Sequence, residues 1–429
     1  MAAEHRLTEL DTGVRVVTEA MPSVRSVALG FWIGTGSRVE SEGQAGLSHL
    51  LEHLLFRGSS RYGSLEIDQI FDAMGAEINA GTGKETTSLF SRVLDVHLER
   101  ALDVMADMVW LPAFEEVDPE RAVVLEEIAM YEDDPQDKIF DVLGQAVFGD
   151  DPLGRAIIGR PEVIRDTPVE AIRAFHRARY RPDTVVVAAA GSVDHERLAE
   201  LVGAAVPREL RSGDGTPPNA PRSRPQVHFE RKETEQYHVC LGAPGIARDD
   251  ERRFALRVLD NILGGTTSSR LFQEVRERRG LAYSVYTFLN HYAGTGQVGL
   301  YLGTRADNLA EALQVVGGEL ERALDEPATG DELVRSKENV KGRVVLSLES
   351  TSTRMNRLGS SILNDVPVLG LDEVIERIDA VTLDDLRELA QELWPLERMS
   401  AAGIGVNQDV FGAAIAPLGL RGPLEVAAA

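Results

Sequence analysis

Three residues in one short apolar stretch could form part of a metal site. His49, Glu52 and His53 stand in the stretch Gly46–Phe56 (GLSHLLEHLLF), which is otherwise typical of a buried helix. Residues four apart lie on the same face of an α-helix, so the two imidazoles can reach one cation. Glu52 is close enough to contact a water molecule on that cation without being a ligand itself. The spacing therefore predicts a zinc site with Glu52 beside it.

The apolar neighbours of these residues favour a bound metal. The two histidines and the glutamate stand among Leu50, Leu51, Leu54, Leu55 and Phe56. A buried polar group without a partner costs about 1 to 3 kcal/mol, and a metal ion is a natural partner for all three. The alternative is a chance pattern of polar residues on a helix.

A catalytic zinc with two histidine ligands needs a third protein ligand and an open position for water. The stretch Asp118–Glu132 predicts a helix, with an acceptor at the cap and a proline in the first turn. Its Glu120 and Glu127 share a face but stand roughly 10 Å apart along the axis, so they cannot both bind one ion. Judged by helical phase alone, Glu126 could be the third ligand as well as Glu127. An acidic face exposed to solvent is the usual explanation for such a run of charges.

The elements around these residues predict an α+β unit with an antiparallel-rich sheet and helices packed on it. Strands are expected at 14–18, 26–33, 76–81, 86–93 and 184–190 from apolar alternation or apolar runs. Helices are expected at 64–74, 96–110 and 194–202 in addition to the two described above.

The second half of the chain repeats the first. Residues 207–226 are rich in Arg, Ser, Gly, Pro and Asp, which predicts an exposed linker between a domain at 1–206 and a domain at 227–429. Trp32–Ser37 aligns with Cys240–Gly245, and at the same separation the metal helix aligns with Arg257–Leu263. The second copy has Arg257 and Asn261 in place of the histidines. The repeat predicts two homologous α+β domains from an internal duplication, the second without metal.

Composition narrows the class of protein. The net charge of −24 without a basic cluster argues against nucleic acid as a partner. The excess acid either keeps the protein soluble or favours cationic peptides. No apolar stretch is long enough to span a bilayer, the start MAAEHR does not resemble a secretion signal, and the chain has one cysteine, Cys240, in an apolar run. We therefore expect a cytoplasmic enzyme in which Cys240 is structural.

The motif at His49–His53, followed about seventy residues later by Glu120–Glu127, resembles the pitrilysin/insulinase family of zinc metallopeptidases. The order His-x-x-Glu-His is that of the inverzincins. More narrowly, the chain resembles the short-chain branch that includes mitochondrial processing peptidase and its bacterial relatives. The resemblance covers nearly the whole chain, including Asp134–Pro135, Pro152–Arg155, Ile158–Arg160 and Tyr180–Pro182. It implies one zinc per chain held by His49, His53 and Glu127, with Glu52 as general base and Glu120 as a supporting carboxylate near substrate.

The resemblance also implies residues that bind substrate. Arg276 and Tyr283 flank Gly280, where a helix is expected to end before a strand, and they resemble the pair that holds the substrate carbonyl in relatives. From the residues alone, both have a structural explanation. The helix dipole favours a basic residue late in a helix, and a tyrosine at the start of a strand usually packs in the core. Asn79 and Ala80 resemble part of an exposed sheet edge on which an extended peptide is added as a strand. An interior strand with Asn79 at a turn is the alternative.

Longer relatives in this family have four α+β domains, which form two bowls around a chamber. The present chain supplies two, one half of such a clamshell, so we expect a homodimer in which Arg276 and Tyr283 act in trans, or a heterodimer with a metal-less paralogue. The resemblance implies an endopeptidase for short or unfolded peptides. A dedicated maturation protease for one precursor and a noncatalytic scaffold or core subunit are the alternatives.

Overall fold

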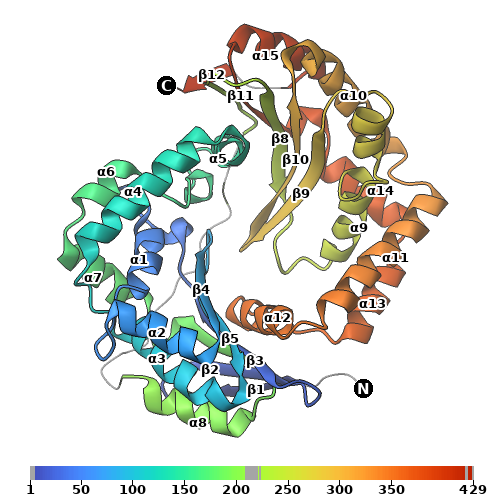
Figure 1. The fold of residues 1–429 in the computed structure, drawn as a ribbon. Coiled ribbons are helices and arrows are strands. Elements are labelled where there is room, and N and C mark those ends of the chain that lie inside the picture. Colours follow the sequence, from blue (N-terminus) through green and yellow to red (C-terminus); the bar gives the residue numbers. More distant parts are fainter. Residues whose placement is uncertain (1–4, 208–220, 222–223, 421–423, 428–429) are drawn as a thin grey trace. The chain divides into compact units, whose positions relative to one another are not determined.

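A computed structural model describes residues 5–207, 221, 224–420 and 424–427, without the side chains of the last four. The chain forms two compact units (Figure 1). The first consists of Met1–Ile128, Ala156–Thr216 and Val345–Asp372, and the second of Ala129–Arg155, Pro217–Val344 and Glu373–Ala429. Each unit therefore includes one segment from the other half of the sequence. The domains expected from the sequence, 1–206 and 227–429, were contiguous. Most of the expected linker at 207–226 lies outside the described residues.

The first unit contains a six-stranded sheet in the order β1-β2-β6-β3-β5-β4. Every pairing is antiparallel except that of β2 with β6. In the described chain β4 pairs only with β5, so its other edge is open. The strands are β1 (His5–Glu9), β2 (Arg15–Ala20), β3 (Ser26–Ile33), β4 (Glu77–Thr82), β5 (Thr87–Leu94) and β6 (Val185–Gly191).

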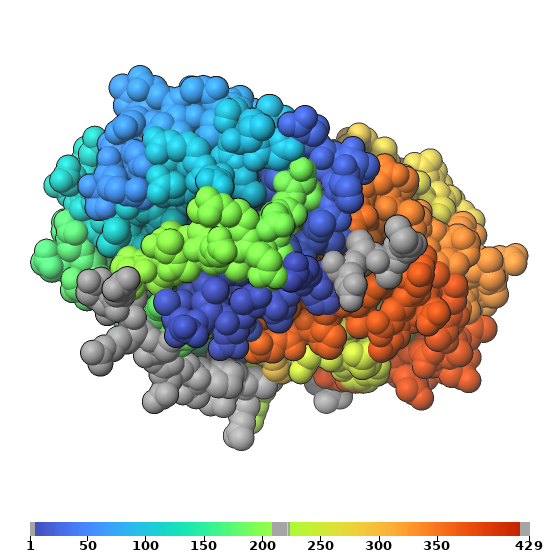
Figure 2. Space-filling model, turned by 90° about the horizontal axis from the view of Figure 1, so that it is seen from below, coloured from blue at the N-terminus to red at the C-terminus, as the bar shows by residue number. Residues whose placement is uncertain are grey.

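Helices cover both faces of this sheet. The helices are α1 (Leu47–Leu55), α2 (Ser64–Met74), α3 (Leu98–Trp110), α4 (Val117–Asp133, which continues into the second unit), α6 (Pro161–Asp166), α7 (Val169–Arg179), α8 (His195–Ala205) and α12 (Thr351–Leu363). One apolar core joins leucines of α1 to residues of α3 and to alternate residues of the strands. Figure 2 shows α8 in light green beside the blue N-terminal strands, against which it packs.

The opposite face of the sheet is covered by α12, which comes from the second half of the sequence. Its Met355 and Leu358 pack on alternate residues of β6, among them Ala188 and Ala190. The strand expected at 184–190 is buried along its whole length because a helix layer lies on each face. Small side chains on this face let the helix approach closely.

A buried ion pair fixes α12 to the sheet. The side chain of Glu19 on β2 is fully buried, and its two carboxylate oxygens accept hydrogen bonds from Arg354 and Arg357. The bond from Arg357 Nη2 to Glu19 Oε2 is 3.1 Å long. A buried carboxylate needs such partners, so this pairing favours one position of α12 on the sheet.

The second unit repeats the plan of the first. Its six-stranded sheet has the order β12-β7-β11-β8-β10-β9, in which β7, β11, β8, β10 and β9 correspond to β2, β6, β3, β5 and β4. The strands are β7 (Val227–Arg231), β8 (Tyr237–Gly245), β9 (Ser284–Tyr292), β10 (Thr295–Thr304), β11 (Ser400–Gly405) and β12 (Leu424–Ala427). The shared order agrees with an internal duplication and confirms the α+β class.

A helix from the first half of the sequence covers one face of the second sheet. The helix α5 (Pro135–Phe148) packs on β8 and β11, with Leu143 and Val147 against Cys240, Ala402 and Ile404. Cys240 is fully buried, and burial raises the pKa of its thiol, which agrees with a structural role. The other helices of this unit are α9 (Arg253–Leu263), α10 (Ala306–Asp325), α11 (Gly330–Ser347), α13 (Leu371–Ala380), α14 (Leu383–Leu393) and α15 (Gln408–Ile415).

The expected elements agree with the structure to within a few residues at their ends. The strand at 26–33 and the helix at 64–74 have the expected bounds, and the latter ends at Gly75 in the left-handed conformation. No helix in the described part of the chain is long and apolar enough to cross a membrane.

Candidate metal centre

The helix α1 divides its residues between a buried face and a polar face. Its leucines are buried in the core, whereas the side chains of His49 and His53 remain 12% and 21% exposed. The two imidazole rings lie with their centroids 4.7 Å apart. The four-residue spacing therefore brings both rings to one place, as the sequence predicted.

Glu127 on α4 reaches the two imidazoles. Its Oε2 lies 3.6 Å from His49 Nε2 and 3.3 Å from His53 Nε2, and the donor atoms of the three residues lie within 4.8 Å of one another. Ligands of a tetrahedral zinc stand about 2.0 to 2.2 Å from the ion and so roughly 3.4 Å from each other. The donor set and its spacing therefore fit a zinc ion. Glu126, the alternative by helical phase, is exposed and is not part of this cluster.

Glu120 orients one of the histidines. Glu120 is 2% exposed, and its Oε1 accepts a hydrogen bond of 2.7 Å from His53 Nδ1, while Oε2 pairs with Arg57. With the proton on Nδ1, the lone pair of His53 Nε2 is free for a metal. His49 differs, because within the described chain its buried Nδ1 has no hydrogen-bond partner. Burial lowers the pKa of His49 and so favours the neutral ring that a metal requires.

Glu52 is held by the edge strand of the sheet. Its Oε2 accepts a hydrogen bond from the hydroxyl of Thr82, the last residue of β4. Burial raises the pKa of Glu52, and the bond from Thr82 opposes that shift. A carboxylate with a raised pKa accepts a proton more readily than a solvated one. The arrangement thus puts a proton acceptor next to the metal-type donors.

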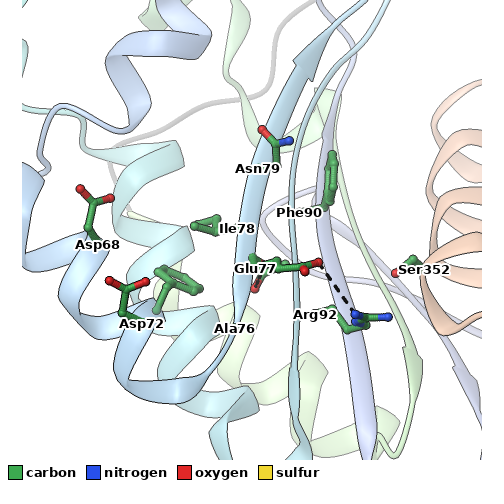
Figure 3. Close-up of a pocket in the computed structure, with 11 residues that line it drawn as sticks. Asp68, Asp72, Ala76, Glu77, Ile78, Asn79, Phe90, Arg92 and Ser352 are labelled. Atoms are coloured by element: carbon green, nitrogen blue, oxygen red, sulfur yellow. Dashed lines mark hydrogen bonds and ion pairs between the residues drawn. The ribbon is translucent and has the colours of Figure 1, made fainter.

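The residues Asn79 and Ala80 lie on β4, whose open edge excludes the alternative of an interior strand. A cavity of about 650 Å³ borders the first half of this strand (Figure 3). Ile78 points toward α2, with its Asp68 and Asp72, whereas Glu77 reaches the opposite side and pairs with Arg92 at 3.8 Å. The strand β4 therefore leads from this cavity to Thr82 and Glu52.

Arg276 and Tyr283 lie together in the second unit, whereas the donor cluster belongs to the first. The Arg276 guanidinium stacks 4.2 Å from the centre of the Tyr283 ring, and its Nη1 donates a hydrogen bond of 3.1 Å to the Tyr283 carbonyl. Tyr283 is 74% exposed. An exposed aromatic ring beside a guanidinium is available for contact with another molecule.

In the second unit the positions of the two histidines are occupied by Arg257 and Asn261. Asn261 Nδ2 donates a hydrogen bond of 2.9 Å to Asn339 Oδ1 on α11. Among the described residues, His49, His53 and Glu127 form the one group of three or more His, Cys, Asp or Glu side chains whose ligand atoms lie close enough to share a metal ion. At the position of His53 the second copy thus has an amide that bonds to another amide.

The sequence did not predict the contact of Thr82 with Glu52, nor the contributions of Arg57 and Glu40 to the site. Glu40 is 3% exposed and accepts hydrogen bonds from the first turn of α1. Thr82 and Glu40 reach the motif from other elements and have no periodic spacing to it. Arg57 does have one, since it stands four residues after His53, the same interval as that between His49 and His53. A polar residue that stands outside the motif helix carries no local signal of its tertiary partner.

Comparisons with known proteins agree on one family. The family described as "Insulinase (Peptidase family M16)" matches residues 15–160, and "Peptidase M16 inactive domain" matches residues 167–340. A protein of Streptomyces coelicolor named as an uncharacterized zinc protease is 43% identical over 414 residues, which cover 94% of this chain and 90% of that protein. A protein of Bacillus subtilis with the same description is 41% identical over 388 residues, covering 89% and 94%.

Two solved structures share the fold. The crystal structure of a peptidase M16 inactive domain from Pseudomonas fluorescens gives a TM-score of 0.86 at 22% identity and covers 94% of this chain and 98% of that one. The crystal structure of a protease from Helicobacter pylori gives a TM-score of 0.87 at 22% identity and covers 94% and 100%. From the family matches and the zinc protease relatives together, we conclude that this chain belongs to the insulinase family, peptidase family M16.

Proposed function

We propose that this protein is a zinc-dependent endopeptidase that hydrolyses short or unfolded peptides. The observation that carries the proposal is the convergence of His49, His53 and Glu127 from two helices, with Glu52 beside them. Membership of a peptidase family, with relatives named as zinc proteases, supports the same conclusion.

The residues of the centre have separate roles in this proposal. His49, His53 and Glu127 would hold a zinc ion, which would supply Lewis-acid chemistry, lowering the pKa of a water molecule toward about 7 and polarising a carbonyl. Glu52 accepts the proton from that water and passes it to the leaving amine. Thr82 holds Oε2 of Glu52, which leaves Oε1 available for the proton. Glu120 keeps Nε2 of His53 directed at the metal.

The substrate docks as an added strand on β4. Asn79 and Ala80 lie on the strand with the open edge, where alternate residues present their backbone groups, and the last residue of the same strand contacts Glu52. A peptide paired with this edge would run from the cavity at Glu77 toward the donor cluster. Backbone pairing of this kind accepts many side chains, so the proposal is an enzyme of broad specificity.

The proposed assembly is a homodimer that closes a chamber. Arg276 and Tyr283 of the partner subunit would hold the substrate carbonyl, for which the described first unit offers no obvious fixed donor besides the metal. A heterodimer with a metal-less paralogue would meet the same need. A closed chamber admits short or flexible chains, which is why we propose such peptides as substrates, and the proposed compartment is the cytoplasm.

The test combines metal analysis with cleavage of a mixed pool of unstructured peptides, read by mass spectrometry. We expect about one zinc per chain, cleavage of many peptides, and inhibition by a chelator that added zinc reverses. Glu126→Gln serves as a control, since Glu126 is an exposed neighbour of Glu127 on the same helix. Cleavage of one precursor but not of the pool would indicate a maturation protease. Absence of zinc and of cleavage would indicate a noncatalytic subunit.

A further inference from the structure

The helix α1, which carries His49 and His53, has no capping side chain of its own at its N-terminus. It has nine residues, and its N-cap residue is Gly46, which has no side chain and a φ of +101°. A Cβ atom at Gly46 would lie 2.8 Å from the Cα of Gly159, so no other residue fits there. The hydroxyl of Ser48 is buried without a hydrogen-bond partner in the described chain. The first turn, which contains His49, is therefore not secured by α1 itself.

Glu40 supplies the missing cap from outside the helix. Its Oε2 accepts a hydrogen bond of 2.8 Å from the backbone N–H of Gly46, and its Oε1 accepts one of 2.6 Å from that of Ser48. The side chain is buried, so water does not compete for these bonds. A carboxylate at this end of a helix also interacts favourably with the helix dipole. Both oxygens of Glu40 are thus used to fix the start of α1.

The segment that carries Glu40 is itself attached to the turn between β4 and β5. The backbone N–H of Arg38 donates a hydrogen bond of 2.7 Å to the carbonyl of Lys84, and the Arg38 guanidinium pairs with Glu85. The backbone N–H of Ser37 donates one of 3.2 Å to the carbonyl of Gly83. Residues 37–40 therefore connect the end of the edge strand to the start of the metal-type helix.

The two histidines depend on this connection to different degrees. His53 is in the last turn of α1 and is oriented by Glu120. His49 is in the first turn, and its Nδ1 has no partner among the described residues, so its position follows from the backbone that Glu40 holds. Loss of Glu40 would release the first turn and move His49 while leaving His53 in place.

We propose that Glu40 is a positioning residue of the metal centre, which sets the first turn of α1 so that His49 meets His53 and Glu127. The inference rests on the proposed zinc centre. It does not require that the enzyme cleave peptides, since the expected consequence is on metal binding. It assigns a function in the site to a carboxylate that is neither a ligand nor a proton acceptor.

The experiment compares Glu40→Gln and Glu40→Ala with Asp194→Ala in the full chain. Asp194 is the matched control, because it caps α8 in the same unit by accepting a hydrogen bond of 2.8 Å from the N–H of Arg197. For each variant, zinc affinity is measured by competition with a chelator, and the visible spectrum of the Co²⁺-substituted protein reports coordination geometry. Circular dichroism and the unfolding temperature show that each variant is folded at the temperature used.

We expect both Glu40 variants to bind zinc about 10- to 100-fold more weakly and to change the Co²⁺ spectrum, as is typical when a residue that orients a ligand is lost. Asp194→Ala should lower the unfolding temperature but leave affinity and spectrum unchanged. If Glu40→Ala does not fold, Glu40→Gln decides, since it retains one acceptor. A folded Glu40→Gln with the affinity and spectrum of the wild type would overturn the inference. A wild-type chain that binds no zinc would overturn the metal centre itself.

Discussion

The hydroxyl of Thr82, at the end of the edge strand β4, donates a hydrogen bond to Oε2 of Glu52 on α1. This contact joins the proposed docking edge for substrate to the proposed proton acceptor. A peptide added to β4 would therefore be held at a fixed distance from Glu52. The bond also leaves the second oxygen of Glu52 for chemistry.

Removal of this contact should slow catalysis without loss of metal. Thr82→Val keeps the shape of the side chain but removes the donor, so Glu52 becomes free to rotate. Since hydrogen bonds to charged groups contribute about 1.5 to 3 kcal/mol, we expect kcat to fall roughly 10- to 100-fold. Thr82→Ser should restore most of it. Steady-state kinetics with a zinc assay check this, and equal kcat values for Thr82→Val and wild type would contradict it.

Glu52 and Glu127 should be separable by substitution. Glu52→Gln removes the proton acceptor but no ligand, so we expect zinc to be retained while kcat falls by about 10² to 10⁴. Glu127→Gln replaces a charged ligand by a neutral amide and should lose both zinc and turnover. Metal analysis of the purified variants, together with a peptide cleavage assay, distinguishes the two. Near-normal turnover by Glu52→Gln would refute the mechanism.

Glu120 should affect metal affinity through His53. Glu120→Gln keeps one acceptor but removes the charge that pairs with Arg57 and holds the proton on His53 Nδ1. We expect zinc affinity to fall about 10- to 100-fold with the protein still folded. Chelator competition measures the effect, with Glu126→Gln as control. If Glu120 served only to hold substrate, KM would rise while zinc affinity stayed the same.

His176 should make stability depend on pH. Its Nε2 donates a hydrogen bond of 2.9 Å to the carbonyl of Val109, and burial lowers its pKa from 6.5 to about 4. Below pH 6.5 the unfolded chain binds a proton that the native protein does not. The contribution of neutral His176 to the free energy of unfolding is therefore complete above pH 6.5 and is lost as the pH falls toward 4. The slope of the free energy of unfolding against pH approaches about 1.4 kcal/mol per pH unit in this range.

The variant His176→Gln keeps a donor but does not titrate in this range. The free energy of unfolding should therefore decrease less steeply for this variant than for wild type between pH 6.5 and 4.5, a range chosen from the shifted pKa. Denaturant unfolding at several pH values gives both curves. Parallel curves would show that His176 is not buried in its neutral form.

The proposed dimer predicts a dependence on protein concentration. If Arg276 and Tyr283 of the partner subunit complete the site, specific activity should rise with protein concentration until the dimer is saturated. Gel filtration of active fractions measures the size directly. Mixing Glu52→Gln chains with Arg276→Ala chains should restore activity, because one mixed site then contains both intact groups. An active monomer would exclude the arrangement.

The sequence by itself determined the local features of this protein. The spacing of His49 and His53 placed both on one helical face, because helix geometry depends only on positions along the chain. The bounds of α2, with Gly75 as its end, followed from propensity and turn chemistry, which are also local. The metal-type motif, the α+β class and the duplication could be predicted for this reason.

Only the tertiary structure decided which residues from other elements reach the motif helix. Helical phase left Glu126 and Glu127 equally available and the resemblance favoured Glu127, whose Oε2 the fold brings to 3.3 Å from His53 Nε2. Thr82 and Glu40 meet α1 from other elements, and α12 covers the first sheet from the far end of the sequence. Such contacts depend on packing between segments that are far apart in the sequence. They produce no periodicity or fixed spacing along the chain, so sequence patterns do not predict them.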